Sequence, residues 1–194
     1  MLSKPGRLAT ALSIAELSCG GCSRDPDTQL RVPDGTPIVL ISVDTLRSDR
    51  LPAYGYHGVD TPAIDALRAD GILFQRAYTH VPLTLPAHVS LLTGLLPPTH
   101  GVRDNLGYSV DAASAPLVQQ TLKTAGYATG AGVSAYVLRR GTGLDAGFDF
   151  YEDGISNVPD HSGPGIQNVQ RPGSDTLEAC LLYTSDAADD DTIV

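Results

Sequence analysis

Three side chains in the sequence are suited to ester chemistry: one aspartate, and a threonine and a histidine four residues apart. Asp44 follows the apolar run "PIVLISV", while Thr84 and His88 lie in "VPLTLPAHVSLLTG" at 81–94. A threonine hydroxyl is a weak nucleophile unless a base or a metal ion draws off its proton. The pattern leaves two interpretations of Thr84 open, a working nucleophile or the cap of an ordinary helix.

Asp44 also has two interpretations. A carboxylate at the carboxyl end of a buried strand can bind a metal ion without burying an unpaired charge. In open parallel sheets, ligands gather at these strand ends. The alternative is that Asp44 only caps the turn "DTLRSD".

The residues around Thr84 predict an anion site. We expect a helix that begins near Pro86 and ends at Gly94. Thr84 would then lie beside several free backbone N–H groups and the positive end of the helix dipole, which together favour phosphate or sulfate. His88, one turn inside this helix, either donates to the same anion or packs against its neighbours.

The elements that must position these residues alternate between strand and helix. Such alternation is typical of a doubly wound α/β sheet. The segments are a buried strand at Pro37–Asp44, a helix between the cap Thr61 and Gly71, an extended segment or strand at Ile72–His80, the helix at 86–94, a helix at 115–126 closed by Gly126, and a short buried strand at 127–135.

The N-terminal region predicts export. Residues 1–22 combine basic residues, a short apolar run and small residues around Cys19 and Cys22, which resembles a bacterial lipoprotein signal. The alternative is a disordered N-terminus. Residues 23–36 are polar and rich in Pro and Gly, as in a linker. The formal net charge of −9 gives no reason to expect a nucleic-acid partner.

Two stretches near the C-terminus differ from the rest. A Gly-, Pro- and Asn-rich loop fills 154–174, and a domain at 37–175 is expected to end there. Residues 177–194 contain five acidic side chains and no Lys or Arg, and they resemble translated sequencing-adapter read-through. We therefore expect a truncated N-terminal fragment with a non-native tail; the alternative is an acidic C-terminal tail.

Four blocks, in order, resemble the N-terminal half of the sulfatase group of the alkaline phosphatase superfamily. They are "ISVDTLRSDRLPAYGY", "TPAIDALRADGILFQRAYTHVPLTLPAHVSLLTGLLPPTHGVRDN", "LKTAGYATGAGVSA" and "GLDAGFDFYED", within 37–153. The resemblance implies an α/β/α sandwich, of which this chain has the N-terminal part only. It also implies a divalent metal ion (Ca, Mg, Mn or Zn) and attack on a sulfate or phosphate ester through a covalent intermediate.

By position, the resemblance makes Asp44 a metal ligand and Thr84 both the nucleophile and a metal ligand. His88 stands where typical sulfatases have an activating arginine, and Thr45 stands where many have a second acid. Their nucleophile is a Cys or Ser converted to formylglycine, which threonine cannot give. The Gly-Lys-Trp-His found in typical sulfatases is replaced by "GAGVSAYVL".

The turn His100–Asn105 matches the last part of the second block. Its functional interpretation is a wall of the site, with Arg103 or Asn105 reaching the substrate. Its alternative is a surface turn after a helix.

The first functional prediction is an exported, metal-dependent hydrolase of sulfate or phosphate esters, periplasmic or lipid-anchored, acting on small molecules, glycans or lipids. The alternatives are a phosphodiesterase or phosphoryl transferase of the same superfamily, which accept an unmodified threonine, and a non-catalytic binding protein that kept the fold.

Overall fold

The computed structural model describes residues 33–155 and 172–178 of the chain. The predicted export signal at 1–22, most of the linker at 23–36, the loop at 156–171 and most of the tail at 177–194 lie outside the described residues, as do all three cysteines. Within the part that is described, no helix is long and apolar enough to cross a bilayer.

Four α-helices, four single 3₁₀ turns and two short strands follow one another along the described chain. They are η1 (Ser48–Arg50), η2 (Pro52–Tyr54), α1 (Pro62–Asp70), α2 (Thr84–Thr93), α3 (Pro97–His100), α4 (Val118–Thr124), β1 (Gly130–Gly132), η3 (Tyr136–Leu138), η4 (Arg140–Thr142) and β2 (Phe150–Glu152). A further helical turn covers 173–178.

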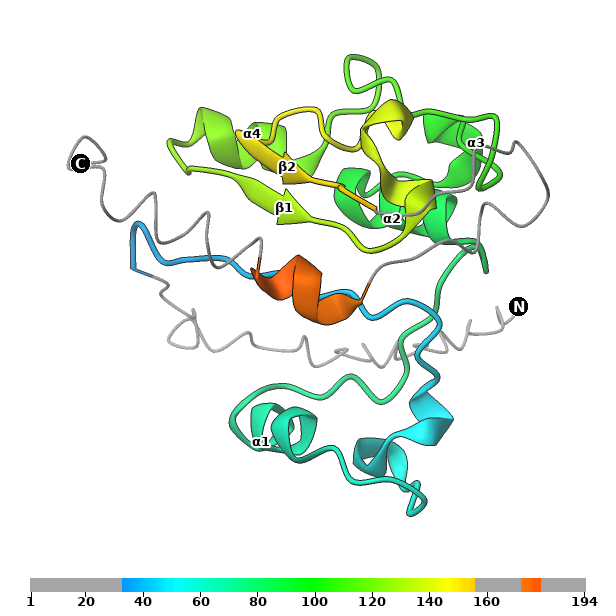
Figure 1. Cartoon of the computed structure of the whole chain (residues 1–194), viewed down its shortest axis with the longest axis vertical. Helices are drawn as coiled ribbons and strands as arrows, with labels where there is room; N and C mark the ends of the chain where they lie inside the picture. The colour runs from blue at the N-terminus through cyan, green and yellow to red at the C-terminus, as the bar shows by residue number, and fades with distance from the viewer. Residues whose placement is uncertain (1–32, 156–171, 179–194) are drawn as a thin grey trace, which may run out of the picture. The chain divides into compact units, whose positions relative to one another are not determined.

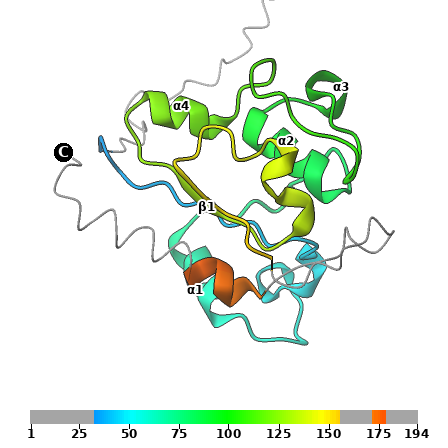
Figure 2. The ribbon, with the colours of Figure 1, turned by 45° about the horizontal axis from the view of Figure 1, so that its top comes forward.

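Strands β1 and β2 form a parallel pair in which Gly130, Ala131 and Gly132 lie opposite Phe150, Tyr151 and Glu152. Parallel strands need a crossover connection, and here η3 and η4 supply it. Figures 1 and 2 both show the two strands side by side. The mixed α/β class is confirmed, while the larger doubly wound sandwich stays a prediction.

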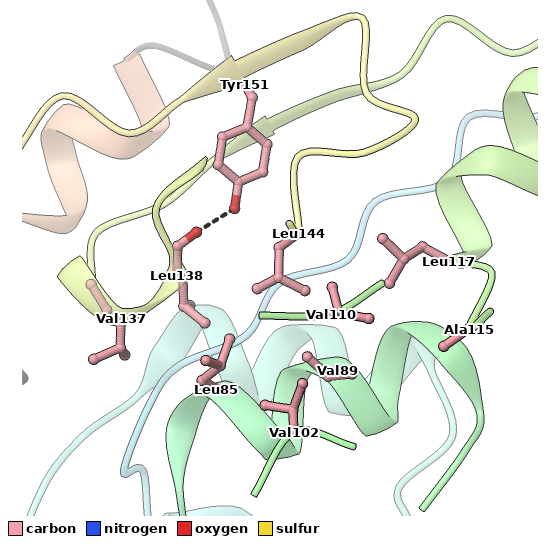
Figure 3. Close-up of a cluster of buried hydrophobic side chains, with 11 residues drawn as sticks. Leu85, Val89, Val102, Val110, Ala115, Leu117, Val137, Leu138, Leu144 and Tyr151 are labelled. Carbon is pink, nitrogen blue, oxygen red and sulfur yellow. Dashed lines mark hydrogen bonds between the residues drawn. The ribbon is translucent and has the colours of Figure 1, made fainter. Parts of the chain in front are cut away.

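The buried core consists of side chains from within residues 85–151, and it packs against one side of α2 (Figure 3). Leu85 and Val89 are both fully buried, because residues four apart share one face of a helix. They pack with Val102, Val110, Ala115, Leu117, Ala135, Val137, Leu138, Leu144 and Tyr151. α2 is therefore held firmly, and it carries Thr84 and His88.

The helix predictions are confirmed with shifted ends. α1 starts at Pro62 after Thr61 and stops before Gly71, as expected. α2 ends at Gly94, whose φ of 69° is the left-handed conformation that glycine tolerates best. It starts at Thr84, two residues earlier than predicted, because Leu83 is the last extended residue. α4 is shorter than the predicted helix at 115–126.

The strand prediction for Pro37–Asp44 is wrong for this structure. No strand is assigned there, and Val39 and Ile41 are 80% and 70% exposed. A strand exists only when a neighbour pairs with its backbone, and no described segment does so. The segment Ile72–His80 likewise forms no strand, and the strand predicted at 127–135 is limited to Gly130–Gly132 and is partly exposed.

Candidate functional site

Thr84 and Asp44, forty residues apart in the chain, are joined side chain to side chain. The Thr84 hydroxyl donates a hydrogen bond to Oδ2 of Asp44 over 3.0 Å. Thr84 is partly buried as the first residue of α2, whereas Asp44 is exposed. The structure therefore brings together the hydroxyl of Thr84 and the carboxylate of Asp44, which the sequence predicts as candidate residues of one site.

The other oxygen of Asp44 contacts the residue that follows it. Oδ1 accepts a hydrogen bond from the backbone N–H of Thr45 over 3.0 Å. Thr45 has a φ of 57°, and it is the one residue other than glycine with a positive φ among those described. For a β-branched residue, this left-handed conformation costs about 1 to 3 kcal/mol. Backbone strain thus lies directly beside the candidate ligand.

The start of α2 offers fewer free N–H groups than the sequence predicts. The N–H of Leu85 donates to the side-chain oxygen of Asn105 over 2.9 Å, and that of Ala87 donates to the carbonyl oxygen of Leu83 over 3.0 Å. Pro86 has no N–H. Of these first residues, Thr84 keeps the N–H that can meet an anion, at the positive end of the helix dipole.

His88 uses both ring nitrogens in hydrogen bonds. Nδ1 lies 2.7 Å from the carbonyl oxygen of Thr84, and Nε2 lies 2.9 Å from the hydroxyl oxygen of Ser42. A carbonyl oxygen only accepts, so the proton of the neutral ring is on Nδ1. A direct contact between His88 and a bound anion stays a prediction, because it would require one of these bonds to be exchanged.

The two predicted substrate-binding residues of the turn after α3 differ in their surroundings. Asn105 uses its side-chain oxygen at the start of α2, which leaves its NH₂ group as the donor to a substrate. Arg103 is exposed, and within 33–155 and 172–178 no partner of its guanidinium is found. Both roles in substrate binding stay predictions.

His100, in the same turn, has a structural role. It is buried, its Nδ1 accepts the N–H of Val102 over 3.2 Å, and its Nε2 lies 2.9 Å from the hydroxyl of Ser90. Burial lowers the pKa of His100 below its usual value. The neutral ring therefore fastens the turn to α2 and positions Asn105.

An open pocket of about 760 Å³ lies along α2 on the side of His88. Ala87 and His88 line it together with Leu91, which lies one turn further along the same side of the helix. Thr84 comes one turn before them. The remaining lining residues are Ser42, Ala77, Tyr78, Thr79, His80, Ser90, Gly94, Leu95 and Leu96.

A divalent cation would find two oxygen ligands here. The Asp44 carboxylate and the Thr84 hydroxyl are the hard donors that Ca²⁺, Mg²⁺ and Mn²⁺ prefer, and they already contact each other. In the described part of the chain, no group of three or more His, Cys, Asp or Glu side chains comes together. The donor types fit a metal ion, and these two residues would supply part of its ligand shell.

Sequence reasoning missed Ser42. The residue lies inside the apolar run "IVLISV", where it looks like one more strand residue. The available clue was its position two residues before Asp44, because alternate residues of an extended segment point to the same side.

Comparison with known proteins supports the resemblance. The Sulfatase family profile matches residues 36–192, which is most of the chain. An arylsulfatase of Clostridium perfringens is 41% identical over 64 residues, covering 33% of this chain and 13% of that protein. Human iduronate 2-sulfatase is 37% identical over 97 residues, covering 50% and 18%, and human arylsulfatase A is 36% identical over 97 residues, covering 48% and 19%.

The matched regions are thus less than a fifth of the length of these three relatives. No solved structure matches the chain. The range matched by the family profile covers all four ordered blocks. The chain belongs to the sulfatase family of the alkaline phosphatase superfamily.

Proposed function

We propose that this chain is part of a metal-dependent hydrolase of sulfate or phosphate esters in which Thr84 is the nucleophile. The observation that carries the proposal is the hydrogen bond from the Thr84 hydroxyl to Asp44 at the first residue of α2. Relatives named for arylsulfatase and iduronate 2-sulfatase activity support an ester of this class.

Asp44 and the start of α2 supply complementary parts of the chemistry. The carboxylate orients the hydroxyl of Thr84 and receives its hydrogen bond. As the hydroxyl of Thr84 loses its proton to solvent, its oxygen attacks the sulfur or phosphorus, the bond to the alcohol breaks, and the departing alkoxide takes up a proton from solvent to leave as the alcohol. Water then hydrolyses the ester formed on Thr84, which restores the free hydroxyl.

The charge of Asp44 explains why a cation belongs to the proposal. An exposed carboxylate beside the nucleophile repels an anionic ester, by about 1 kcal/mol at 4 Å in water and by more where water is excluded. Asp44 and Thr84 would hold the ion. When bound, a divalent cation supplies positive charge that favours the alkoxide of Thr84 and neutralises the ester.

Phosphate esters are the second candidate substrate class, and one residue favours them. Position 84 is threonine, which cannot be converted to formylglycine. A threonine alkoxide can attack the phosphorus of a phosphodiester or phosphomonoester as well as the sulfur of a sulfate ester. Phosphodiesterase or phosphoryl transferase chemistry on a glycan or lipid is therefore proposed alongside sulfate hydrolysis.

The location of the enzyme is part of the proposal. Residues 1–22 have the basic, apolar and small-residue order of an export signal, and Cys19 or Cys22 would carry a lipid. This supports a periplasmic or lipid-anchored enzyme.

An activity assay on the full chain tests the proposal. p-Nitrophenyl sulfate, p-nitrophenyl phosphate and bis-p-nitrophenyl phosphate are compared with Ca, Mg, Mn or Zn and with a chelator. We expect metal-dependent turnover that Thr84→Ala abolishes and Thr84→Ser retains, and the preferred ester identifies the class. Equal turnover by wild type and Thr84→Ala would contradict the proposal.

A further inference from the structure

Two side-chain contacts join residues 42–44 to helix α2, and Ser42 makes one of them. Its hydroxyl oxygen lies 2.9 Å from Nε2 of His88. Two residues further on, Asp44 accepts the hydrogen bond from Thr84 over 3.0 Å. Segment 42–44 and the first two turns of α2 are thus joined at two points.

The two contacts match in spacing. Two residues of extended chain advance about 6.6 Å, and four residues of α-helix advance about 6.0 Å. Ser42 and Asp44 therefore face His88 and Thr84 in register, with the chain running in the opposite direction to the helix. Shifting segment 42–44 by one residue would break both contacts together.

The tautomer of His88 suits this contact. Because Nδ1 donates to the carbonyl oxygen of Thr84, the lone pair of the neutral ring is on Nε2 and accepts the hydroxyl of Ser42. His88 in this way links Ser42 to the backbone of the residue that carries the nucleophile.

Little else holds segment 42–44 in place. It is not part of a strand, and the neighbouring side chains Ile41 and Val43 are 70% and 59% exposed. A single hydrogen bond typically contributes about 0.5 to 1.5 kcal/mol. The Asp44–Thr84 contact alone would leave the carboxylate poorly positioned.

We propose that Ser42 and His88 form a positioning pair, which fixes the register of segment 42–44 along α2 and thereby holds Asp44 against the hydroxyl of Thr84. The proposal rests on the proposed role of Thr84 as nucleophile. Ser42 touches no reacting atom, so it acts through His88 and Asp44. The proposal thus adds Ser42 to the site, a residue that is not among the site residues predicted from the sequence.

The test compares three substitutions of the pair with a control in the full chain. Ser42→Ala removes the hydroxyl and Ser42→Thr restores it. His88→Asn keeps a donor near the position of Nδ1, for the carbonyl oxygen of Thr84, but loses Nε2. Ser109→Ala alters an exposed serine for which no partner is found among the described residues.

Turnover of the preferred p-nitrophenyl ester is the first readout. We expect Ser42→Ala to lower kcat by about 10- to 100-fold with little change in KM, since misplacement by about 1 Å has that effect. Ser42→Thr should return to within a few-fold of wild type, and Ser109→Ala should match it. In the His88→Asn background, Ser42→Ala should have no further effect.

Nuclear magnetic resonance provides a readout that does not need turnover. The ring nitrogens of His88 should show the Nδ1–H tautomer, and Ser42→Ala should shift the Nε2 signal and weaken the hydrogen bond from the Thr84 hydroxyl to Asp44. Unchanged signals would overturn the positioning pair even in an inactive protein. Wild-type kcat in Ser42→Ala, with Thr84→Ala inactive, would overturn it while leaving the proposed function standing.

Discussion

The side-chain oxygen of Asn105 accepts the backbone N–H of Leu85 over 2.9 Å and so caps the second residue of α2. A residue from the turn after α3 thereby completes the start of the helix that carries Thr84. The same turn is anchored by buried His100, which contacts Ser90 of α2. Asn105 therefore stabilises the start of the helix that carries Thr84, independently of any contact with a substrate.

Replacing Asn105 separates capping from substrate contact. Asn105→Ala should lower the free energy of unfolding by about 1 kcal/mol, the usual cost of a lost helix cap. Asn105→Asp keeps the acceptor and adds favourable charge at the helix start, so its stability should match wild type. The same charge should raise KM for an anionic ester. Urea unfolding and ester kinetics measure both, and an unaltered stability of Asn105→Ala would rule out the capping role.

Thr45→Asp should make the chain more stable and tighten metal binding. Aspartate tolerates the left-handed φ of 57° better than a β-branched residue, which relieves strain without metal. Its carboxylate also adds an oxygen ligand beside Asp44, at the position where many sulfatases have an acid. Thermal unfolding with and without Ca²⁺, Mg²⁺ or Mn²⁺ should show a larger metal-induced rise in Tm than in wild type. An equal rise in both proteins would place the ion elsewhere.

Tyr151 links β2 to the core through its hydroxyl, which donates to the carbonyl oxygen of Leu138 over 2.5 Å (Figure 3). Burial raises the pKa of Tyr151 far above its ordinary value. A raised pKa in the folded state stabilises the fold below pH about 10, and this stability is lost as pH rises further.

Tyr151→Phe should therefore cost about 1 to 2 kcal/mol at pH 7, because the buried carbonyl of Leu138 loses its donor. The difference between the two proteins should shrink above pH 10. Denaturant unfolding at pH 7 and pH 11 checks both points. A difference that does not change with pH would show that the hydroxyl ionises freely in the folded protein.

Asp149 ties the end of α4 to the start of the sheet. It pairs with Lys123 and accepts the N–H and the hydroxyl of Thr129, each over 3.0 Å. The hydrogen bond from Lys123, followed by that from Thr129, lowers the pKa of Asp149. A lowered pKa contributes stability above the unfolded value of about 4, and this contribution is lost as pH falls below it.

Asp149→Asn should consequently reduce stability at pH 7 and flatten the loss of stability between pH about 5 and 2. Asp60→Asn, at an exposed carboxylate without a hydrogen bond among the described residues, serves as the control. Thermal unfolding across this pH range provides the measurement. If Asp149→Asn follows the wild-type pH curve, the carboxylate does not contribute through its ionised form.

Local patterns predicted the helices because their ends depend on neighbouring residues. Pro62 and Gly71 bound α1, and Gly94 ends α2 through its left-handed φ. The strand at Pro37–Asp44 failed because pairing depends on a distant partner, which an apolar run alone does not provide. The observed start of α2 differs from the predicted one because no residue type near Leu83 indicates that the extended chain ends there.

The site was predictable in part for the same reason. Asp44 and Thr84 matched a family pattern, and the structure brings them into contact. The pairing of His88 with Ser42 and the capping by Asn105 depend on which surfaces meet across forty-six and twenty residues. Residue type alone does not reveal such long-range partners.

Trapping the ester on Thr84 tests the central claim most directly. The full chain is mixed with the preferred p-nitrophenyl ester and divalent metal, quenched in acid within one turnover, and analysed by mass spectrometry of its peptides. The account predicts one sulfo or phospho group on the peptide containing Thr84, absent in Thr84→Ala and without metal. Turnover at the wild-type rate with no adduct on that peptide, or with an adduct on another residue, would contradict it.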